Sequence, residues 1–427
     1  MTASRVSGLG SRVGGGTAID SALSPRESGP GTRNPEPLAE VLDAASAGQG
    51  LPREWAYRLI RAEGQDLDAL LRAASALRDR RTGRTITYSR KVFIPLTNLC
   101  RDQCGYCTFV RRPGDPKAHT MTPEEVLAVA QAGRRAGCKE ALFSLGDKPE
   151  RRYTFHRQWL GQQGYDSTLA YLRDMCALVL ERTGLLPHAN PGAMDDESIG
   201  ALRDVNVSLG MMVESLSPRL FQPGGAHRGC PDKLPRPRLA TLEAAGRLQV
   251  PFTTGILIGI GETPEERVEA LLAIKQANDR YGHVQEVIVQ NFRAKPDIAM
   301  RDWPEPDTQE MLRTAAVARL LLGPEINLQA PPNLTPEGYP LYLRAGINDW
   351  GGVSPVTLDC INPELAWPAL EELSRNTEAA GFELRERLAI YPEFALQPDR
   401  FLATRLHQPV QRWVDETGLV RPYMEQW

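Results

Sequence analysis

The stretch Lys91-Val-Phe-Ile-Pro-Leu-Thr-Asn-Leu-Cys-Arg-Asp-Gln-Cys-Gly-Tyr-Cys107 joins a short apolar segment to three closely spaced cysteines. Residues 92–96 predict a buried β-strand, because a short apolar run bounded by polar residues is typical of one. Cys100, Cys104 and Cys107 follow in the loop after this strand, where three thiolates can surround one centre. Clustered cysteines in a reducing context usually bind metal, so the loop predicts a metal centre.

Beyond this loop, strand and helix patterns alternate along the chain. Further apolar runs lie at residues 141–145, 207–213, 252–258, 284–289 and 326–328. Helical patterns separate them; two begin with Thr-Pro-Glu-Glu, at Thr122 and Thr263, and a third begins at Asp307 or Thr308. Alternating units of this length imply parallel strands joined by crossover helices. The sequence therefore predicts an α/β fold with a (β/α) TIM-like barrel; an open doubly wound sheet is the alternative, against which no Gly-x-Gly-x-x-Gly follows the first strand.

The composition divides the chain into four regions. Residues 1–37 are rich in Gly, Pro and Ser and almost lack aromatic residues, so we expect a disordered tail. Amphipathic helical patterns predict a helical cap over residues 38–84. Residues 85–365 hold the alternating units of the barrel core. Residues 366–427 predict one helix, over 367–380, and an extension that packs on the barrel.

Charge and composition exclude several classes of function. The 50 Lys and Arg residues and 53 Asp and Glu residues give a net charge of −3, so we expect no nucleic-acid or membrane partner. The sequence has no apolar run of about 18 residues and no secretory signal, so we expect a cytoplasmic protein. Seven cysteines do not suit a disulfide scaffold, and those without ligand spacing are interpreted as buried thiols: Cys138, Cys176, Cys230 and Cys360.

The order Cys-x-x-x-Cys-x-aromatic-Cys resembles the signature of the radical S-adenosylmethionine (SAM) superfamily. The resemblance implies a 4Fe–4S cluster held by Cys100, Cys104 and Cys107, with SAM chelating the iron that no cysteine holds. It also implies that the reduced enzyme cleaves SAM to methionine and a 5′-deoxyadenosyl radical, which abstracts a hydrogen atom from the substrate. Tyr106, the aromatic residue of the motif, would lie near the adenine of SAM.

A second segment resembles the turn of this superfamily that binds the SAM amino group. Residues 143–150, Phe-Ser-Leu-Gly-Asp-Lys-Pro-Glu, stand where these enzymes carry a Gly-Gly-Glu-Pro-like turn. The resemblance therefore assigns Gly146 and Asp147 to SAM. The match is partial, because Leu145 replaces the first Gly and Asp147 replaces the Glu.

Two further positions are predicted to contact SAM. Residues 255–262, Gly-Ile-Leu-Ile-Gly-Ile-Gly-Glu, resemble another strand of the superfamily, which assigns Gly259 and Glu262 to the cofactor. Two glycines in a buried strand also permit a close approach to the backbone. Glu214 ends a predicted strand, and barrel active sites gather at the carboxyl ends of strands, so we expect it to bind SAM or substrate.

Three polar segments, residues 187–192, 289–293 and 345–352, are each predicted to follow a strand. Amide and hydroxyl-binding side chains at strand ends suit a polyhydroxylated, nitrogen-rich small molecule. The candidate substrate-binding residues in these segments are Asn190, Gln290, Asn291, Asn348, Asp349 and Trp350.

Several segments together resemble the CofG-type subfamily of radical SAM enzymes. The resemblance covers about residues 85–400 and is carried above all by residues 290–296 and 347–355. It implies an ammonia-releasing carbon–nitrogen lyase of deazaflavin coenzyme biosynthesis, which forms 7,8-didemethyl-8-hydroxy-5-deazariboflavin (FO). The implied substrate is the tyrosine-derived adduct 5-amino-5-(4-hydroxybenzyl)-6-(ribitylimino)uracil, made by a CofH-type partner, and an electron donor is also implied. No catalytic side chain is identified.

Two alternatives stay open at this point. Resemblance of segments does not determine the substrate, so a CofH-type, menaquinone-pathway or biotin-synthase-like radical SAM reaction is the first. The second is a zinc-binding interaction module, because three ligands and one open position also suit zinc; the missing fourth ligand and the long barrel-like chain argue against it. Zinc predicts a colourless protein that leaves SAM intact, whereas an iron–sulfur cluster predicts a brown protein.

Overall fold

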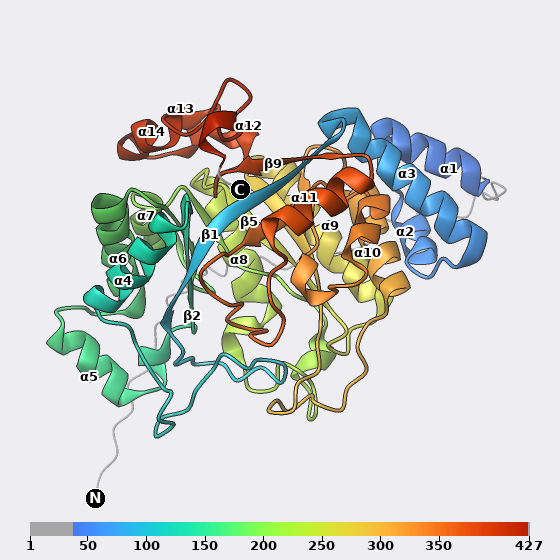
Figure 1. Cartoon of the computed structure of the whole chain (residues 1–427). Helices are drawn as coiled ribbons and strands as arrows, with labels where there is room; N and C mark the ends of the chain where they lie inside the picture. Colours follow the sequence, from blue (N-terminus) through green and yellow to red (C-terminus); the bar gives the residue numbers. More distant parts are fainter. Residues whose placement is uncertain (1–36, 426–427) are drawn as a thin grey trace, which may run out of the picture. The chain divides into compact units, whose positions relative to one another are not determined.

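The structure, a computed structural model, describes residues 37–425 and contains a closed barrel of parallel strands (Figure 1). The strands follow one another around the sheet from β2 to β8, and β1 pairs with both β8 and β2, which closes the ring. The predicted (β/α) barrel is therefore confirmed, and the open sheet is wrong. The strands are β1 (Thr85–Thr97), β2 (Glu140–Leu145), β3 (Leu186–Asn190), β4 (Ser208–Gly210), β5 (Phe252–Ile258), β6 (Val284–Asn291), β7 (Asn327–Gln329) and β8 (Asp349–Val353).

Helices connect the strands on the outside of the barrel. The hydroxyls of Thr122 and Thr263 each accept a hydrogen bond from the backbone N–H three residues later, and a Glu side chain at that position returns the bond. Asp307 caps a third helix in the same way with its carboxylate. The three predicted helix starts are confirmed. The helices are α4 (Pro123–Arg135), α5 (Thr154–Gln162), α6 (Thr168–Thr183), α7 (Asp196–Arg203), α8 (Pro235–Arg247), α9 (Pro264–Tyr281) and α10 (Thr308–Leu322).

The chain before β1 forms α1 (Leu38–Ala44), α2 (Arg53–Leu59) and α3 (Gly64–Thr82). α3 packs against α10, and its buried Arg78 donates to the carbonyl oxygens of Leu343 and Ile347. The tail predicted before these helices lies, up to residue 36, outside the described residues. No helix within residues 37–425 is long and apolar enough to cross a membrane.

The chain after β8 is more ordered than the sequence predicted. The expected helix is present as α11 (Leu370–Ala379), but a ninth strand follows, β9 (Glu383–Arg387), which pairs in parallel with the first half of β1. Strand β9 was missed because its sequence, Glu-Leu-Arg-Glu-Arg, has one apolar residue. Three short helices then gather beside β9 at the top of Figure 1: α12 (Pro392–Ala395), α13 (Pro398–Phe401) and α14 (Thr404–Gln411).

The length of β1 separates the two ends of the barrel. Its first half pairs with β8 and β9, and its second half, from Lys91 onward, pairs with β2. We call the end where the strands begin, closed by residues 383–425, the base, and the end with the loops that follow the strands, including the cysteine loop, the mouth. Thr87 near the start of β1 pairs with Asp349, so β8 begins at the base. Residues 345–352 follow β7, but the expectation that they lie at the carboxyl end of a strand is wrong, because Asp349 is the first residue of β8. Residues 187–190 do not follow a strand either, because they form most of β3.

Candidate active site at the mouth of the barrel

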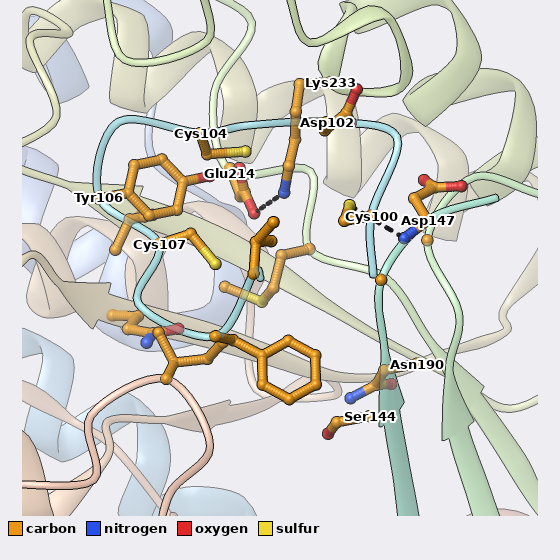
Figure 2. A pocket seen from close by; sticks show the side chains of 18 of the residues that line it. Cys100, Asp102, Cys104, Tyr106, Cys107, Ser144, Asp147, Asn190, Glu214 and Lys233 are labelled. Carbon is orange, nitrogen blue, oxygen red and sulfur yellow. Dashed lines mark hydrogen bonds and ion pairs between the residues drawn. The ribbon is translucent and has the colours of Figure 1, made fainter. Parts of the chain in front are cut away.

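A cavity of about 270 Å³ lies at the mouth of the barrel (Figure 2). The cysteine loop after β1 and the carboxyl ends of β2, β3, β5 and β6 supply its walls. Of the predicted site residues, those that line this cavity are Cys100, Cys104, Tyr106, Cys107, Gly146, Asp147, Asn190, Glu214, Gln290 and Asn291. Cations that the sequence analysis did not single out also line it: Lys233, Arg238, Arg293 and Lys295.

The backbone holds the first cysteine against the end of β2. The N–H of Asp147 donates to Sγ of Cys100 at 3.2 Å, and the N–H of Arg101 donates to the carbonyl of Asp147 at 2.8 Å. A Cβ atom on Gly146 would lie 1.9 Å from the carbonyl oxygen of Leu99. Only glycine fits there, so Gly146 permits the close approach between the cysteine loop and β2.

The donor set of the loop fits a cluster better than a single ion. Around one zinc ion, with Zn–S bonds of about 2.3 Å, three sulfur atoms lie within about 4 Å of one another. Within residues 37–425 the three Sγ atoms are not among the groups whose ligand atoms all lie within 4.8 Å of one another. The thiols of Cys100, Cys104 and Cys107 nevertheless line one cavity, which suits the wider spacing of a multi-iron centre.

Burial keeps two of the three thiols protonated in the absence of a metal. It raises the pKa of Cys100 to about 12 and also raises the pKa of Cys107. The pKa of Cys104 is lowered, first by a hydrogen bond with the thiol of Cys230. Cys230 was interpreted as an ordinary buried thiol, and the structure places it beside a candidate ligand because the β4–α8 segment folds over the cysteine loop, where Gly105 donates to the carbonyl of Ala226 at 2.8 Å.

A buried network connects Tyr106 with Glu214. The Tyr106 hydroxyl donates to Oε2 of Glu214 at 2.5 Å and lies 3.1 Å from Nε2 of His227. Nζ of Lys233 lies 2.5 Å from the other oxygen of Glu214. Burial opposes the charge of Glu214, but Lys233, His227 and Arg238 outweigh it and hold the pKa of the carboxyl group well below its usual range. The side of the cavity next to Cys104 therefore carries an ionised, paired carboxylate.

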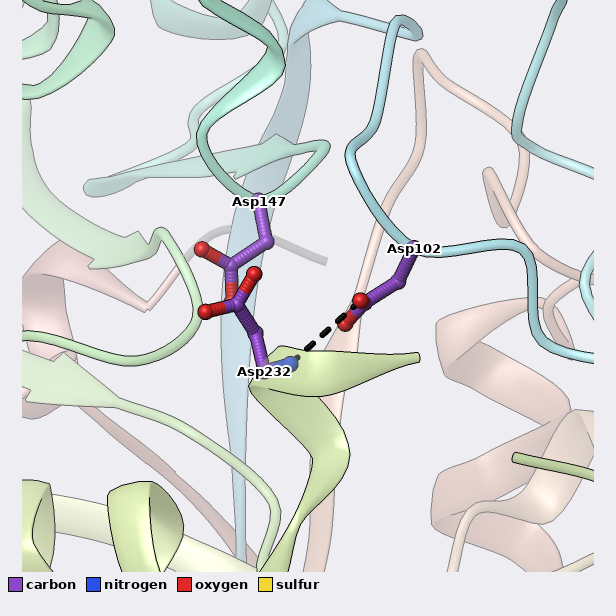
Figure 3. Close-up of side chains that lie close together, drawn as sticks. All are labelled: Asp102, Asp147 and Asp232. Atoms are coloured by element: carbon purple, nitrogen blue, oxygen red, sulfur yellow. Dashed lines mark hydrogen bonds between the residues drawn. The ribbon is translucent and has the colours of Figure 1, made fainter. Parts of the chain in front are cut away.

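Three buried carboxylates, of Asp102, Asp147 and Asp232, meet behind the cysteine loop (Figure 3). Cations of the chain pair with Asp147 and Asp232, whereas burial and these two carboxylates raise the pKa of Asp102 to about 6. Nζ of Lys148 lies 2.7 Å from Asp147 and 3.7 Å from Asp232, and Arg101 lies 3.2 Å from Asp232. Oδ2 of Asp147 also accepts from the N–H of Ala193 at 2.9 Å. The group therefore braces the turn after β2, and the Asp147 carboxylate is used within the protein.

The segment assigned to SAM from residues 255–262 is only partly in the cavity. Leu257 lines the cavity, but Gly259 and Glu262 do not. The Glu262 carboxylate accepts from the N–H groups of Gly259 and Ile260, at 2.8 and 2.9 Å, and pairs with Arg267 at 2.6 Å. These bonds hold the turn that joins β5 to α9. Glu262 therefore stabilises a turn next to the cavity and does not line the cavity itself.

The third polar segment lies at the base, away from the cavity. Asn348 accepts from Arg319 at 2.6 Å and from the N–H of Leu328 at 2.9 Å. The Asp349 carboxylate pairs with Arg387, and Nε1 of Trp350 donates to Thr377 at 3.0 Å. None of the three lines the cavity, so the structure does not bring them together with Asn190, Gln290 and Asn291.

Reasoning from the sequence missed the cations of the cavity. Lys295 belongs to the segment Gln-Asn-Phe-Arg-Ala-Lys-Pro, whose resemblance was noted, and its Nζ donates to the carbonyl of Ile361 at 2.9 Å. Burial lowers the pKa of Lys295. Lys233 and Arg238 flank the start of α8 and have no motif around them, so only the tertiary structure reveals their place.

Comparisons with known proteins agree with this geometry. Residues 94–274 match the model of the radical SAM superfamily. The chain is 49% identical over 416 residues to "FO synthase" of Streptomyces coelicolor, with 95% of this chain and 48% of that protein covered. It is 51% identical over 336 residues to "7,8-didemethyl-8-hydroxy-5-deazariboflavin synthase" of Methanopyrus kandleri, with 79% of this chain and 100% of that protein covered. The chain thus spans about half the length of the FO synthases it matches and the whole of the Methanopyrus protein.

Solved structures agree on the fold. The chain resembles methylornithine synthase (PylB) with a TM-score of 0.64 at 19% identity, covering 81% of this chain and 97% of PylB. It resembles HydG, a maturase of [FeFe]-hydrogenase, with a TM-score of 0.69 at 16% identity, covering 88% of this chain and 80% of HydG. At such low identities the likeness concerns the architecture alone.

Proposed function

Because the chain belongs to the 7,8-didemethyl-8-hydroxy-5-deazariboflavin synthase family of radical SAM enzymes, we propose that it catalyses the CofG-type half of FO formation. The proposed substrate is 5-amino-5-(4-hydroxybenzyl)-6-(ribitylimino)uracil, supplied by a CofH-type partner enzyme. The proposed reaction abstracts a hydrogen atom from this adduct, closes the third ring and releases ammonia, which makes the enzyme a carbon–nitrogen lyase. An electron donor is needed to reduce the enzyme.

The cofactors of this family are a 4Fe–4S cluster and SAM. When bound, they supply a 5′-deoxyadenosyl radical, which takes a hydrogen atom from the substrate. We propose that Cys100, Cys104 and Cys107 hold the cluster, because their thiols line one cavity. The remaining task of the protein is to position SAM and substrate and to exclude water from the cavity.

We propose that SAM lies on the side of the cavity that carries Tyr106 and Glu214. The Glu214 carboxylate, held ionised by Lys233, is suited to accept hydrogen bonds from hydroxyl or ammonium groups. Arg238 is buried, lines the same cavity and donates to the carbonyl of Met212 at 2.8 Å, and its charge is suited to pair with a carboxylate of the ligand. Gly146 contributes through its backbone, because the loop passes it without room for a side chain.

We propose that the adduct occupies the part of the cavity lined by Asn190, Gln290 and Asn291. Arg293 and Lys295 follow Asn291 in the same loop and add positive charge. Amides beside cations suit an adduct that combines a uracil ring, a phenol and a polyhydroxylated ribityl chain. Asn348, Asp349 and Trp350 are left out of this site, because they lie at the base.

The observation that carries the proposal is the match to the Methanopyrus protein, which this chain covers completely at 51% identity. The longer FO synthases, of which the chain covers about half, support the same product class and are compatible with a second half-reaction on another polypeptide or segment.

The test is an anaerobic assay of the reconstituted protein. The mixture contains SAM, a strong reductant, tyrosine, 5-amino-6-ribitylaminouracil and an active CofH-type partner, and FO fluorescence and 5′-deoxyadenosine are followed. Fluorescence that requires both proteins supports the proposal. If this protein alone joins tyrosine to the uracil, it performs the CofH-type half instead. Formation of 5′-deoxyadenosine without any deazaflavin, with the partner active, would assign the substrate to another radical SAM reaction.

A further inference from the structure

A line of hydrogen bonds runs through the barrel from the base to Asn190 at the mouth. Oγ of Ser208 lies 2.7 Å from the carbonyl oxygen of Ala389 and 2.6 Å from Nδ1 of His188. Nε2 of His188 lies 2.9 Å from the side-chain amide of Asn190, and Asn190 lines the cavity. Ser208 and His188 are buried, with 0% and 4% of their surfaces exposed. The Ala389 carbonyl, the Ser208 hydroxyl, the His188 ring and the Asn190 amide therefore bond to one another in sequence, and each bond needs one donor and one acceptor.

The donors and acceptors of the line follow from their chemistry. A carbonyl oxygen only accepts, so the Ser208 hydroxyl donates its one proton to Ala389. Ser208 then has no proton for His188, and Nδ1 of His188 must carry a proton and donate it to Oγ. This step defines which ring nitrogen of the histidine is protonated.

The protonation of the second ring nitrogen follows from burial. Burial lowers the pKa of His188 to about 4, against a smaller opposing effect of Glu140. Lys91 and Arg387 also disfavour a charged ring. At neutral pH the imidazole is neutral and Nε2 has no proton, so Nε2 accepts a hydrogen bond from its neighbour. In Asn190 the only group that can donate it is the side-chain NH₂.

We infer that Asn190 turns its carbonyl oxygen, not its NH₂ group, toward the cavity, and that this oxygen accepts a hydrogen bond from an N–H group of the substrate. The two ends of a side-chain amide have the same shape, so hydrogen-bond partners decide which atom is which. The Asn190 atom 2.9 Å from Nε2, drawn as oxygen in Figure 2, is thereby assigned as the nitrogen. His188 and Ser208 act through Asn190 and are positioning residues.

The backbone of β4 packs closely against the side chains of Asn190 and His188. A Cβ atom on Gly210 would lie 2.1 Å from the inner amide atom of Asn190 and 3.0 Å from Nε2 of His188. This close approach of the β4 backbone limits the rotation of the Asn190 side chain. The amide is therefore presented to the cavity in one orientation.

A second amide of the cavity is available to a ligand. Asn291 on β6 is 3% exposed, and one end of its side-chain amide, placed as Oδ1, has no hydrogen-bond partner within residues 37–425. Burying one end of an amide without a partner is unfavourable, so the cavity is prepared for a polar ligand that pairs with it. An acceptor on β3 and a second amide on β6, strands that are not neighbours, suit a ring with hydrogen-bonding groups on more than one edge, as in a cyclic ureide. This inference rests on the proposed function, whose adduct carries a uracil-derived ring, and adds the atoms that recognise it.

The protonation of His188 can be measured without any substrate. The full chain is labelled with ring-¹⁵N histidine, and the spectrum of His188→Gln identifies the signals of His188. We expect a neutral ring protonated at Nδ1 at neutral pH. A ring protonated at Nε2, or a doubly protonated ring, would overturn the assignment of Asn190.

The direction of the Asn190 amide is tested with two substitutions of similar size. Asn190→Asp keeps an oxygen toward the cavity, and its second oxygen faces Nε2 of His188, which takes up a proton to pair with it. We therefore expect a doubly protonated His188 ring in this variant and a KM for the adduct within about threefold of the wild type. Asn190→Leu removes the acceptor, and we expect that KM to rise about tenfold or more, as for one lost hydrogen bond. If Asn190→Asp loses the adduct as strongly as Asn190→Leu, the inferred polarity is wrong.

Two measurements separate this inference from its alternatives. The affinity for SAM is measured in both variants, and a loss of SAM affinity that matches the loss of adduct affinity would mean that Asn190 contacts SAM instead. Thr183→Val is the control, because it removes a buried polar group outside the cavity, the Thr183 hydroxyl, which donates to the carbonyl of Val179 inside α6. If the wild type forms no FO from the adduct, the proposed function fails and the substrate assignment with it, while the ¹⁵N spectrum still decides the direction of the amide.

Discussion

The base and the mouth of the barrel both bury charged side chains, but those at the base form ion pairs between strands. At the base, Arg387 binds both oxygens of Asp349, at 2.6 and 2.8 Å, and reaches Glu286 at 3.4 Å. Nearby, Nζ of Lys139 lies 2.8 Å from Glu386. The Arg387–Asp349 pair connects β9 to β8, and the Lys139–Glu386 pair connects the residue before β2 to β9. The ion pairs at the base therefore hold strands of the barrel together.

At the mouth, polar groups point into a cavity. Asn291 has an unpaired buried amide atom, Lys295 lines the cavity, and the three thiols of the cysteine loop line the same cavity. The difference teaches that burial of charge alone does not mark a site in this protein. What marks the site is bonding capacity that the protein does not use itself and that faces a cavity.

The cysteines should give the largest effect. Cys100→Ala, Cys104→Ala or Cys107→Ala should each abolish the brown colour of the reconstituted protein and its cleavage of SAM, because each removes a cluster ligand. The thermal unfolding temperature of the metal-free protein should change little. Absorption and iron content measure the cluster, 5′-deoxyadenosine measures SAM cleavage, and calorimetry measures the unfolding temperature. Cys138→Ala is the control, and full activity in any of the three variants would contradict the cluster assignment.

At the base the expected effect falls on stability instead. Arg387→Met leaves the Asp349 carboxylate, which is 0% exposed, without its cation, and should lower the free energy of unfolding by about 3–5 kcal/mol. Cluster content per folded molecule should not change. Arg247→Met breaks the exposed pair with Asp196 and should lower the free energy of unfolding far less, because solvent screens the two charges. If denaturant titrations show equal losses in the free energy of unfolding for the two variants, the buried pair at the base stabilises the fold no more than the exposed pair does.

His188 lies between the two ends and should make stability depend on pH. Its pKa is lowered by burial from 6.5 to about 4 in the folded chain, so the unfolded chain binds more protons between these values. The free energy of unfolding should therefore fall by up to about 3 kcal/mol as pH drops from 6.5 to 4, and this contribution is fully present above 6.5. Denaturant titrations across this range should show a smaller slope for His188→Gln; an identical slope would mean that His188 is charged in the folded protein.

Gly210→Ala should give the smallest effect on activity, because it acts on the site only through Asn190. The added Cβ would meet the Asn190 amide at 2.1 Å, and overpacking of this kind costs about 1–3 kcal/mol. The shift of Asn190 should raise the KM for the adduct while SAM cleavage without adduct persists. Gly161→Ala, in an open position on α5, serves as the control. A variant with wild-type KM would show that Asn190 can move without loss of recognition.

Local signals were sufficient for part of this structure. The three cysteines and the Thr-Pro-Glu-Glu caps are each short, local patterns in the sequence. The helix starts that these caps predicted at Thr122 and Thr263 are confirmed. The alternation of apolar runs and helical patterns likewise predicted the parallel barrel, because parallel strands require crossover connections.

Predictions that needed the position of a strand end were less successful. Asn348 and Asp349 stand in a polar, glycine-rich segment that is typical of a loop, yet Asp349 begins β8. Arg387, 38 residues further along the chain, compensates its charge there. In the same way, β9 has a charged sequence and is stabilised by partners distant in the sequence. No local pattern announces such pairs.

By itself, the sequence determined the kind of chemistry: a three-thiol loop after the first strand of an α/β barrel, with caps and periodicity that require no distant partner. The tertiary structure alone decided which polar segments face the cavity, that Lys233 and Arg238 join the site, and that the Asn190 amide offers its oxygen to a ligand. The physical reason is that thiol spacing and helix caps are properties of neighbouring residues. The end of the barrel at which a side chain lies, and the proton it faces, depend on strand register and on partners brought together only by folding.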